Sequence, residues 1–227
     1  MKKPLEVLQL YPPHDYTLAG AFASRAQRVA ERPFLLFAGK TWSWRGFGER
    51  VDRAARLLLA RGIRRGDRFG VMARNCDGHV LLLFALSRIG AIMVPVNPDF
   101  GVDEARYVLH HAEVSAVAAG SDTLDVARKA CDGLETTPWF VLLDAGRHDV
   151  PLLEDLAARA PDLALPADIS GDETCLIVYT SGTTGFPKGA MHSQGSFVTG
   201  GEAFVQRVYL QDDDRVMIVL PLFHINA

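Results

Sequence analysis

Short apolar runs alternate with amphipathic segments along almost the whole chain, and this alternation limits the possible folds more than any other feature. The segments between the runs carry apolar residues at helical spacing, as at Phe47, Val51, Ala54 and Leu58. Strand–helix alternation favours an α/β fold with mostly parallel sheets and helices on both faces, with ligands bound at the carboxyl ends of the strands. The predicted strands are 34–37, 41–44, 68–73, 92–96, 116–119, 139–143, 174–179 and 216–220, and the predicted helices are 47–60, 77–89, 103–111, 124–130, 152–158 and 194–208.

Charge and cysteine content exclude several classes of protein. The 227 residues include 24 Lys and Arg against 27 Asp and Glu, a formal charge of −3, which argues against a nucleic-acid or anionic-membrane partner. The 3 cysteines are scattered, which excludes a disulfide framework and favours a reducing compartment. The longest apolar stretch, Val80 to Val96, is interrupted by Arg88 and Gly90, so we expect no membrane span and a cytoplasmic protein.

The most informative segment runs from Tyr179 to Gly189, directly after the apolar strand predicted at 174–179. It combines hydroxyl side chains, glycines and a lysine, a set that suits a polyphosphate. Glycines let several backbone N–H groups point at one anion, hydroxyl groups donate adaptable hydrogen bonds, and a lysine adds a point charge. The residues predicted to bind phosphate are Thr180, Ser181, Gly182, Thr183, Thr184, Gly185 and Lys188.

Other phosphate and catalytic motifs do not fit this segment. The common P-loop needs Gly-Lys-Ser/Thr, whereas Lys188 lies between Pro187 and Gly189. The chain has no Gly-x-Gly-x-x-Gly for a dinucleotide and no Gly-x-Ser-x-Gly for a hydrolase nucleophile. The simplest alternative is a flexible turn between a strand and a helix, and the length and order of the motif favour phosphate binding over it.

The 179–189 segment resembles the signature of the adenylate-forming superfamily, which includes acyl-CoA synthetases, adenylation domains of peptide synthetases and firefly luciferases. Four other segments resemble further motifs of these enzymes: Thr41–Trp44, Gly66–Arg68, Ala91–Pro98 and Leu220–His224. Together they make the chain most similar to an acyl-CoA synthetase.

The resemblance implies an acid–thiol ligase that uses ATP, Mg²⁺ and coenzyme A. A carboxylic acid, expected to be a fatty acid, would form an acyl-adenylate and then pass to the coenzyme A thiol. Thr184 would contact Mg²⁺, and His224 would bind the acid substrate; a histidine buried at a strand end is the alternative for His224. The catalytic lysine of the family is expected beyond residue 227, so no catalytic residue is assigned in this chain and the 227 residues alone are expected to be inactive.

The resemblance also predicts the domain organisation. Residues 1–227 would be the N-terminal fragment of an AMP-binding domain, with an N-terminal region (17–66), an α/β region (67–170) and a phosphate-loop region (171–227). The rest of that domain and the small lysine-bearing domain would be absent. Alternatives that stay open are a nucleotide-binding fragment without turnover, and adenylation followed by transfer to a carrier protein or to oxygen. Which acid it is, the length of its acyl chain and the oligomeric state are not predicted.

Two smaller expectations concern single residues. Gln194 stands where many relatives have histidine, at the start of the predicted helix 194–208, and we expect it to affect capping rather than chemistry. His110 and His111 are expected to be exposed and unable to share a metal, because adjacent helix residues point to different sides.

Overall fold

A six-stranded sheet organises the chain, with strand order β6-β5-β3-β4-β7-β8. The computed structural model describes residues 15–144, 149–180, 187–211 and 213–224. The strands from β6 to β7 pair in parallel, and β8 pairs with β7 in the antiparallel direction. The strands are β3 (Arg68–Met72), β4 (Ile92–Pro95), β5 (Ala116–Ala119), β6 (Trp139–Leu142), β7 (Thr174–Thr180) and β8 (Lys188–Ser193). The predicted α/β fold with a mostly parallel sheet is confirmed.

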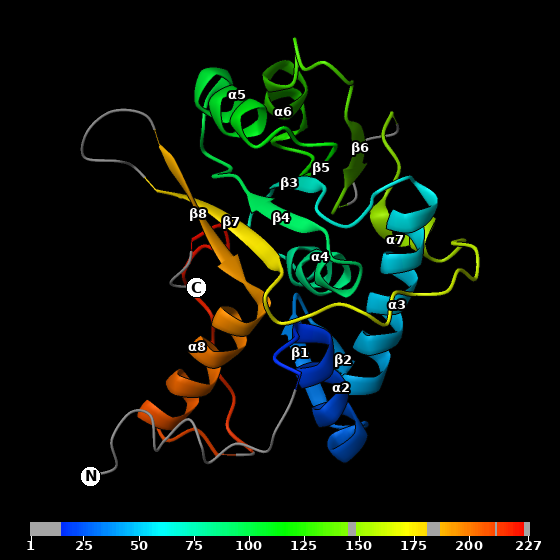
Figure 1. Ribbon diagram of the computed structural model, residues 1–227, viewed down its shortest axis with the longest axis vertical. Helices are drawn as coiled ribbons and strands as arrows, with labels where there is room; N and C mark the ends of the chain where they lie inside the picture. Colours follow the sequence, from blue (N-terminus) through cyan, green and yellow to red (C-terminus); the bar gives the residue numbers. More distant parts are fainter. Residues whose placement is uncertain (1–14, 145–148, 181–186, 212, 225–227) are drawn as a thin grey trace.

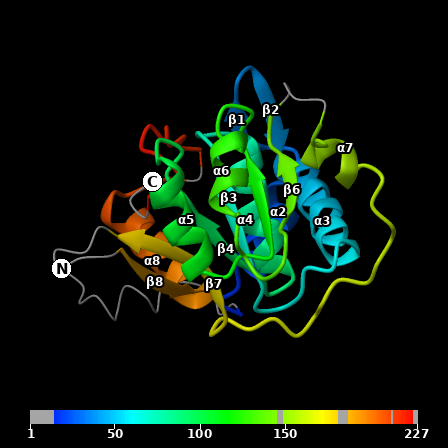
Figure 2. The same ribbon diagram turned by 90° about the horizontal axis from the view of Figure 1, so that it is seen from above.

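Helices cover both faces of this sheet, as the pattern predicts (Figures 1 and 2). Alternate residues of β3 enter different cores: Phe69 and Val71 pack with α3 and α4, whereas Met72 packs with α5 and α6. Strands buried on both faces need apolar residues at every position, so they appear in the sequence as short continuous apolar runs. The helices of the two faces are α3 (Trp44–Ala60) and α4 (Asp77–Arg88) on one side, and α5 (Val102–His111) and α6 (Leu124–Ala130) on the other.

The remaining elements extend the face that carries α3 and α4. The antiparallel strands β1 (Pro33–Phe37) and β2 (Lys40–Ser43), predicted at 34–37 and 41–44, join through Ala38 and Gly39. Both turn residues have positive φ, 48° and 78°, as a two-residue hairpin with the twist of its strands requires. Helices α2 (Leu18–Val29), α7 (Leu153–Ala157) and α8 (Gln194–Arg207) complete the described elements, and α2 was not predicted.

The predicted core strand at 216–220 is wrong. These residues form no strand, and their apolar side chains are exposed, with Met217 at 83% and Val219 at 72%. A strand is stable only when a neighbour pairs with its N–H and C=O groups. No strand of the described residues pairs with this segment, so its apolar composition alone does not make it a strand.

Gln194 also departs from the expectation. The cap of α8 is Ser193, whose side chain accepts a hydrogen bond from the Ser196 N–H. Gln194 is completely buried: its Oε1 accepts from Leu18 N at 3.0 Å, and its Nε2 donates to Ser87 O at 3.1 Å. The side chain therefore joins the first turns of α2 and α8 to the last turn of α4.

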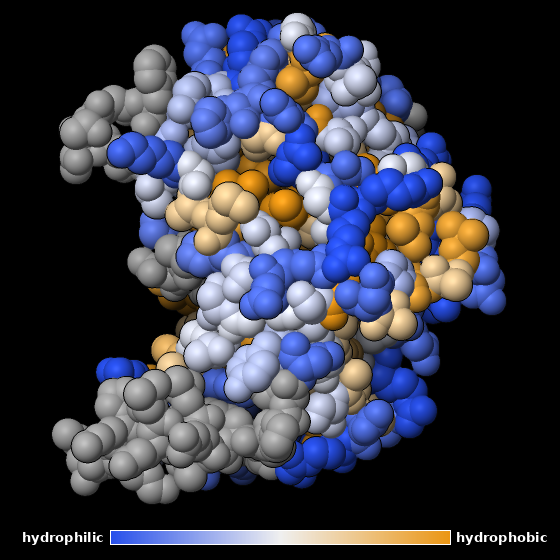
Figure 3. Space-filling view, viewed as in Figure 1, coloured by the Kyte–Doolittle hydropathy of each residue, from blue (hydrophilic) through white to orange (hydrophobic). Residues whose placement is uncertain are grey.

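The face seen in Figure 3 is mostly hydrophilic over α5 and α6, with hydrophobic residues in limited areas between hydrophilic ones. Among the residues that the structure describes, no helix combines the length and the apolar character needed to cross a membrane.

Candidate functional site at the carboxyl edge of the sheet

The strand order places a switch point between β3 and β4. From β3 the chain crosses to β4 on one side, and from β4 it returns to β5 on the other side of β3. The loops after these strands therefore diverge, and open α/β sheets typically bind ligands at such a point, outside the carboxyl ends of their strands. The end of β7 reaches the same edge, because β7 is parallel to β4.

The predicted phosphate loop connects two antiparallel strands. Thr180, the last residue of β7, pairs with Lys188, the first residue of β8. No strand was predicted between the loop and the helix at 194–208, whereas β8 lies there. Ser181, Gly182, Thr183, Thr184 and Gly185 lie outside the described residues, so their assignments stay predictions.

The two predicted phosphate ligands that the structure describes, Thr180 and Lys188, lie opposite each other and are both exposed. Lys188 forms no ion pair with any of the described acidic residues. An exposed ammonium without a carboxylate partner is available to an anion. The geometry therefore presents one hydroxyl and one cation at the base of the loop.

The hairpin is bound to helix α5 by two side chains. The Tyr107 hydroxyl donates to Pro187 O at 3.0 Å, and His111 Nδ1 lies 2.7 Å from the Tyr179 hydroxyl. His111 is exposed, as expected, but it contacts the hairpin. Burial, and to a smaller extent the neighbouring Tyr107, raises the pKa of Tyr179 to about 12, so this hydroxyl stays protonated at neutral pH.

Gly189 provides the space for the Tyr179 ring. The two residues are cross-strand partners, and a Cβ at position 189 would lie 3.2 Å from Tyr179 Cζ and 2.8 Å from Ile177 Cγ2. A side chain here would displace both neighbours. Gly189, the last residue of the motif, therefore allows Tyr179 and Ile177 to pack closely against its backbone beneath the loop.

Asn75 holds the segment that carries His224. The Asn75 Nδ2 donates to Leu220 O at 2.9 Å, and its Oδ1 accepts from Leu222 N at 2.8 Å. The His224 N–H donates to Pro221 O at 3.0 Å, so this residue lies in a turn and is exposed. The structure therefore places the His224 turn near the end of β3, while the Thr180–Lys188 pair belongs to β7 and β8 on the other side of β4.

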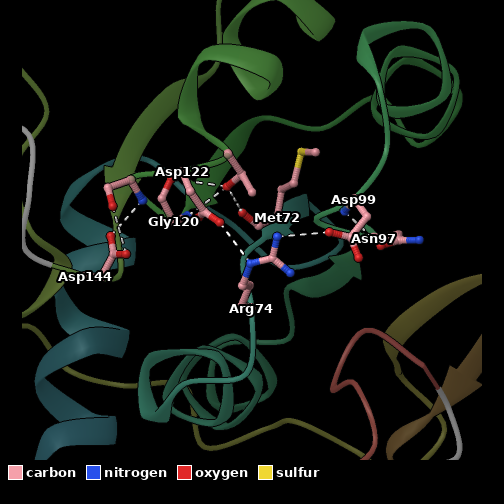
Figure 4. A network of polar contacts seen from close by, with 9 residues as sticks. Met72, Arg74, Asn97, Asp99, Gly120, Asp122 and Asp144 are labelled. Atoms are coloured by element: carbon pink, nitrogen blue, oxygen red, sulfur yellow. Dashed lines mark hydrogen bonds and ion pairs between the residues drawn. The ribbon is translucent and has the colours of Figure 1, made fainter.

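A polar network that the sequence did not predict lines the neighbouring loops (Figure 4). Arg74, which follows β3, contacts Asp122 through Nε and Asp99 through a terminal nitrogen, both at 3.0 Å. The Ser121 N–H donates to Asp144 Oδ1 at 2.7 Å. One charged residue shortly after each of four parallel strands is the signal that could have revealed this network. These contacts join the loops at the carboxyl edge of the sheet.

Metal and thiol chemistry find little support in the described residues. Among the described residues, no group of three His, Cys, Asp or Glu side chains could hold a metal ion. The predicted Mg²⁺ contact, Thr184, lies outside these residues and stays a prediction. Burial raises the pKa of Cys131 to about 12 and that of Cys175 to about 11, which keeps both thiols protonated and unreactive.

Comparisons with known proteins give a consistent result. The model of the family described as AMP-binding enzyme matches residues 22–227. A crotonobetaine/carnitine–CoA ligase of Salmonella paratyphi A is 31% identical over 194 residues, which are 83% of this chain and 37% of that protein. The chain thus spans little more than a third of the length of the curated relatives it matches.

Solved structures show the same fold. A protein assigned as a long-chain-fatty-acid CoA ligase from Rhodopseudomonas palustris is 29% identical with a TM-score of 0.84, over 93% of this chain and 53% of that one. A fatty acyl CoA synthetase of Mycobacterium tuberculosis is similar in fold, with a TM-score of 0.80 at 23% identity, over 93% of this chain and 41% of that one.

Proposed function

The chain belongs to the AMP-binding, adenylate-forming enzyme family, and from this premise we propose that the natural protein that carries it is an acid–CoA ligase. It would activate a carboxylic acid with ATP and transfer the acyl group to coenzyme A. The observation that carries the proposal is the pairing of Thr180 with Lys188 at the base of the Tyr179–Gly189 motif, at the carboxyl edge of the sheet.

The first half-reaction needs charge neutralisation and positioning. A carboxylate oxygen of the acid attacks the α-phosphorus of ATP, the bond to the β-phosphate oxygen breaks, and pyrophosphate leaves. We assign the Lys188 ammonium and the Thr180 hydroxyl, which lie opposite each other, to the triphosphate, together with the predicted ligands from Ser181 to Gly185. Mg²⁺ bound with ATP would neutralise further phosphate charge, with Thr184 as the protein contact.

The second half-reaction transfers the acyl group. The sulfur of coenzyme A attacks the carbonyl carbon of the acyl-adenylate, the thiol loses its proton, and AMP leaves. We assign His224 to the acid side of the site, since Asn75 holds its turn against the end of β3. The catalytic lysine of this chemistry is assigned to a part of the protein beyond this chain.

We propose a fatty acid as the substrate. The support is the likeness to the Rhodopseudomonas protein and the apolar segment 216–220, which ends at the Asn75 contact. The Salmonella relative is named for crotonobetaine and carnitine, so small polar acids belong in the same test. We also propose that residues 17–66, 67–170 and 171–227 are successive regions of one AMP-binding domain.

The experiment measures AMP release by the natural protein with ATP, Mg²⁺ and a panel of fatty, aryl and short polar acids, with and without coenzyme A. We expect acid-dependent ATP–pyrophosphate exchange, and AMP release in proportion to coenzyme A. If ATP–pyrophosphate exchange proceeds but AMP is released only when a carrier protein is added, coenzyme A is not the acceptor of the acyl group. Nucleotide binding without exchange for any acid would support the non-catalytic alternative and reject the ligase.

A further inference from the structure

We propose that Tyr107 and His111 of helix α5 are positioning residues that hold the two ends of the phosphate loop in place for ATP. The proposal rests on the ligase function above and adds two side chains that lie well before the loop in the sequence. They are not assigned any contact with substrate.

The two side chains form one unit. They are four residues apart, so they share a face of α5, and their rings stack with centroids 5.6 Å apart and an interplanar angle of 22°. Tyr107 bonds to Pro187 O on one side of the loop, and His111 bonds to the Tyr179 hydroxyl on the other side. The Tyr107 ring also meets the Tyr179 ring edge to face, at 6.5 Å and 89°. One helix face therefore contacts both strands of the hairpin.

The position of the hairpin explains why such support is needed. β7 pairs with β4 at Leu176, and beyond that point its strand partners among the described residues belong to β8 alone. The ends of β7 and β8 next to the loop extend past the end of β4 (Figure 1). Two strands without further neighbours are only marginally stable in water. α5 supplies, from the side, the support that a neighbouring strand would otherwise give.

The consequence for ATP is a pre-organised loop. If the bases of the loop moved freely, ATP binding would have to order them together with the loop, and that entropy cost would weaken binding. With Tyr179 and Pro187 held by α5, Thr180 and Lys188 stay opposite each other before ATP arrives. Loss of either contact should therefore weaken the use of ATP without changing recognition of the acid.

The first test is kinetic. Tyr107→Phe removes one hydroxyl and keeps the ring, and we expect the KM for ATP to rise about two- to tenfold, the range for one hydrogen bond, while the KM for the acid stays unchanged. His111→Leu should act in the same way. His111→Asn should restore most of the loss, because its amide can occupy the position of Nδ1. Tyr209→Phe is the matched control, since Tyr209 is 82% exposed.

The second test does not depend on activity. Amide hydrogen exchange of peptides covering 174–180 and 187–193 should accelerate about two- to tenfold in Tyr107→Phe and not in Tyr209→Phe, with unchanged melting temperatures. Faster exchange in a protein without ligase activity would overturn the proposed function but keep the positioning role of α5. Unchanged exchange, or equal effects on the KM values for ATP and for the acid, would overturn the positioning role.

Discussion

Replacing Gln194 with leucine should destabilise the fold by about 1–3 kcal/mol. Gln194 is fully buried, and its amide satisfies the Leu18 N–H and the Ser87 carbonyl at 3.0 and 3.1 Å. Leucine has a similar volume but neither donor nor acceptor, so the Leu18 N–H would lose its side-chain partner, and the Ser87 carbonyl would keep only the Gly90 N–H at 3.3 Å. The unpaired Leu18 N–H costs roughly 1–3 kcal/mol and the lost bond to Ser87 O about 1 kcal/mol, while the greater hydrophobicity of leucine offsets about 1 kcal/mol.

Urea unfolding followed by circular dichroism measures this loss directly. In thermal unfolding of a chain of this size, each kcal/mol lowers Tm by about 2–4 °C, so Tm should fall by roughly 2–12 °C. Gln27→Leu is the matched control, because Gln27 is an exposed residue of α2 and its replacement should change stability by less than about 0.5 kcal/mol. Equal stability of the two variants would show that the Gln194 contacts contribute nothing, and the reasoning from buried polar groups would fail here.

Three further predictions address the site and its support. Lys188→Ala should lower kcat/KM for ATP about ten- to a hundredfold, with far-UV circular dichroism unchanged because the side chain is exposed; a change under twofold would remove this lysine from the site. Asn75→Ala removes the bonds to Leu220 and Leu222 and should raise the KM for the acid about two- to tenfold while the KM for ATP stays constant; the reverse pattern would contradict our placement of His224. Burial lowers the pKa of His79 to about 4, below the ordinary 6.5, so the unfolded state binds a proton at higher pH than the folded state does. The free energy of unfolding should therefore fall by about 3 kcal/mol between pH 6.5 and pH 4. His79→Asn should make this fall smaller, and equal pH profiles of the variant and the unsubstituted protein would refute the effect.

The parallel sheet was predictable because its signals are local. Strands β3, β4 and β5 are buried on both faces, so each appears as a short continuous apolar run between amphipathic segments. The predicted ranges 116–119 and 124–130 coincide with β5 and α6. Where a strand faces a core on both sides, an apolar run identifies the strand and places its ends to within one residue, as at β3 and β4.

Strand β8 and the segment 216–220 show the opposite case. β8 has the sequence Lys-Gly-Ala-Met-His-Ser and is largely exposed, so no apolar run marks it. It is a strand because its backbone groups pair with β7. The 216–220 segment has the apolar composition of a strand but lacks such a partner among the described residues. Whether each segment forms a strand therefore depends on pairing with another segment, and a local sequence pattern carries no information on that pairing.

The support of the phosphate loop was not predictable for the same reason. The motif from Tyr179 to Gly189 appears in the sequence as one unit. The residues that hold its ends lie far from it in the chain: Tyr107 is 80 positions from its partner Pro187, and His111 is 68 positions from its partner Tyr179. Only the arrangement of the sheet, with β7 beside β4 and α5 following β4, brings that helix face to the hairpin. The chemistry of such a loop can thus be inferred from neighbouring residues, whereas its rigidity depends on contacts that the fold makes.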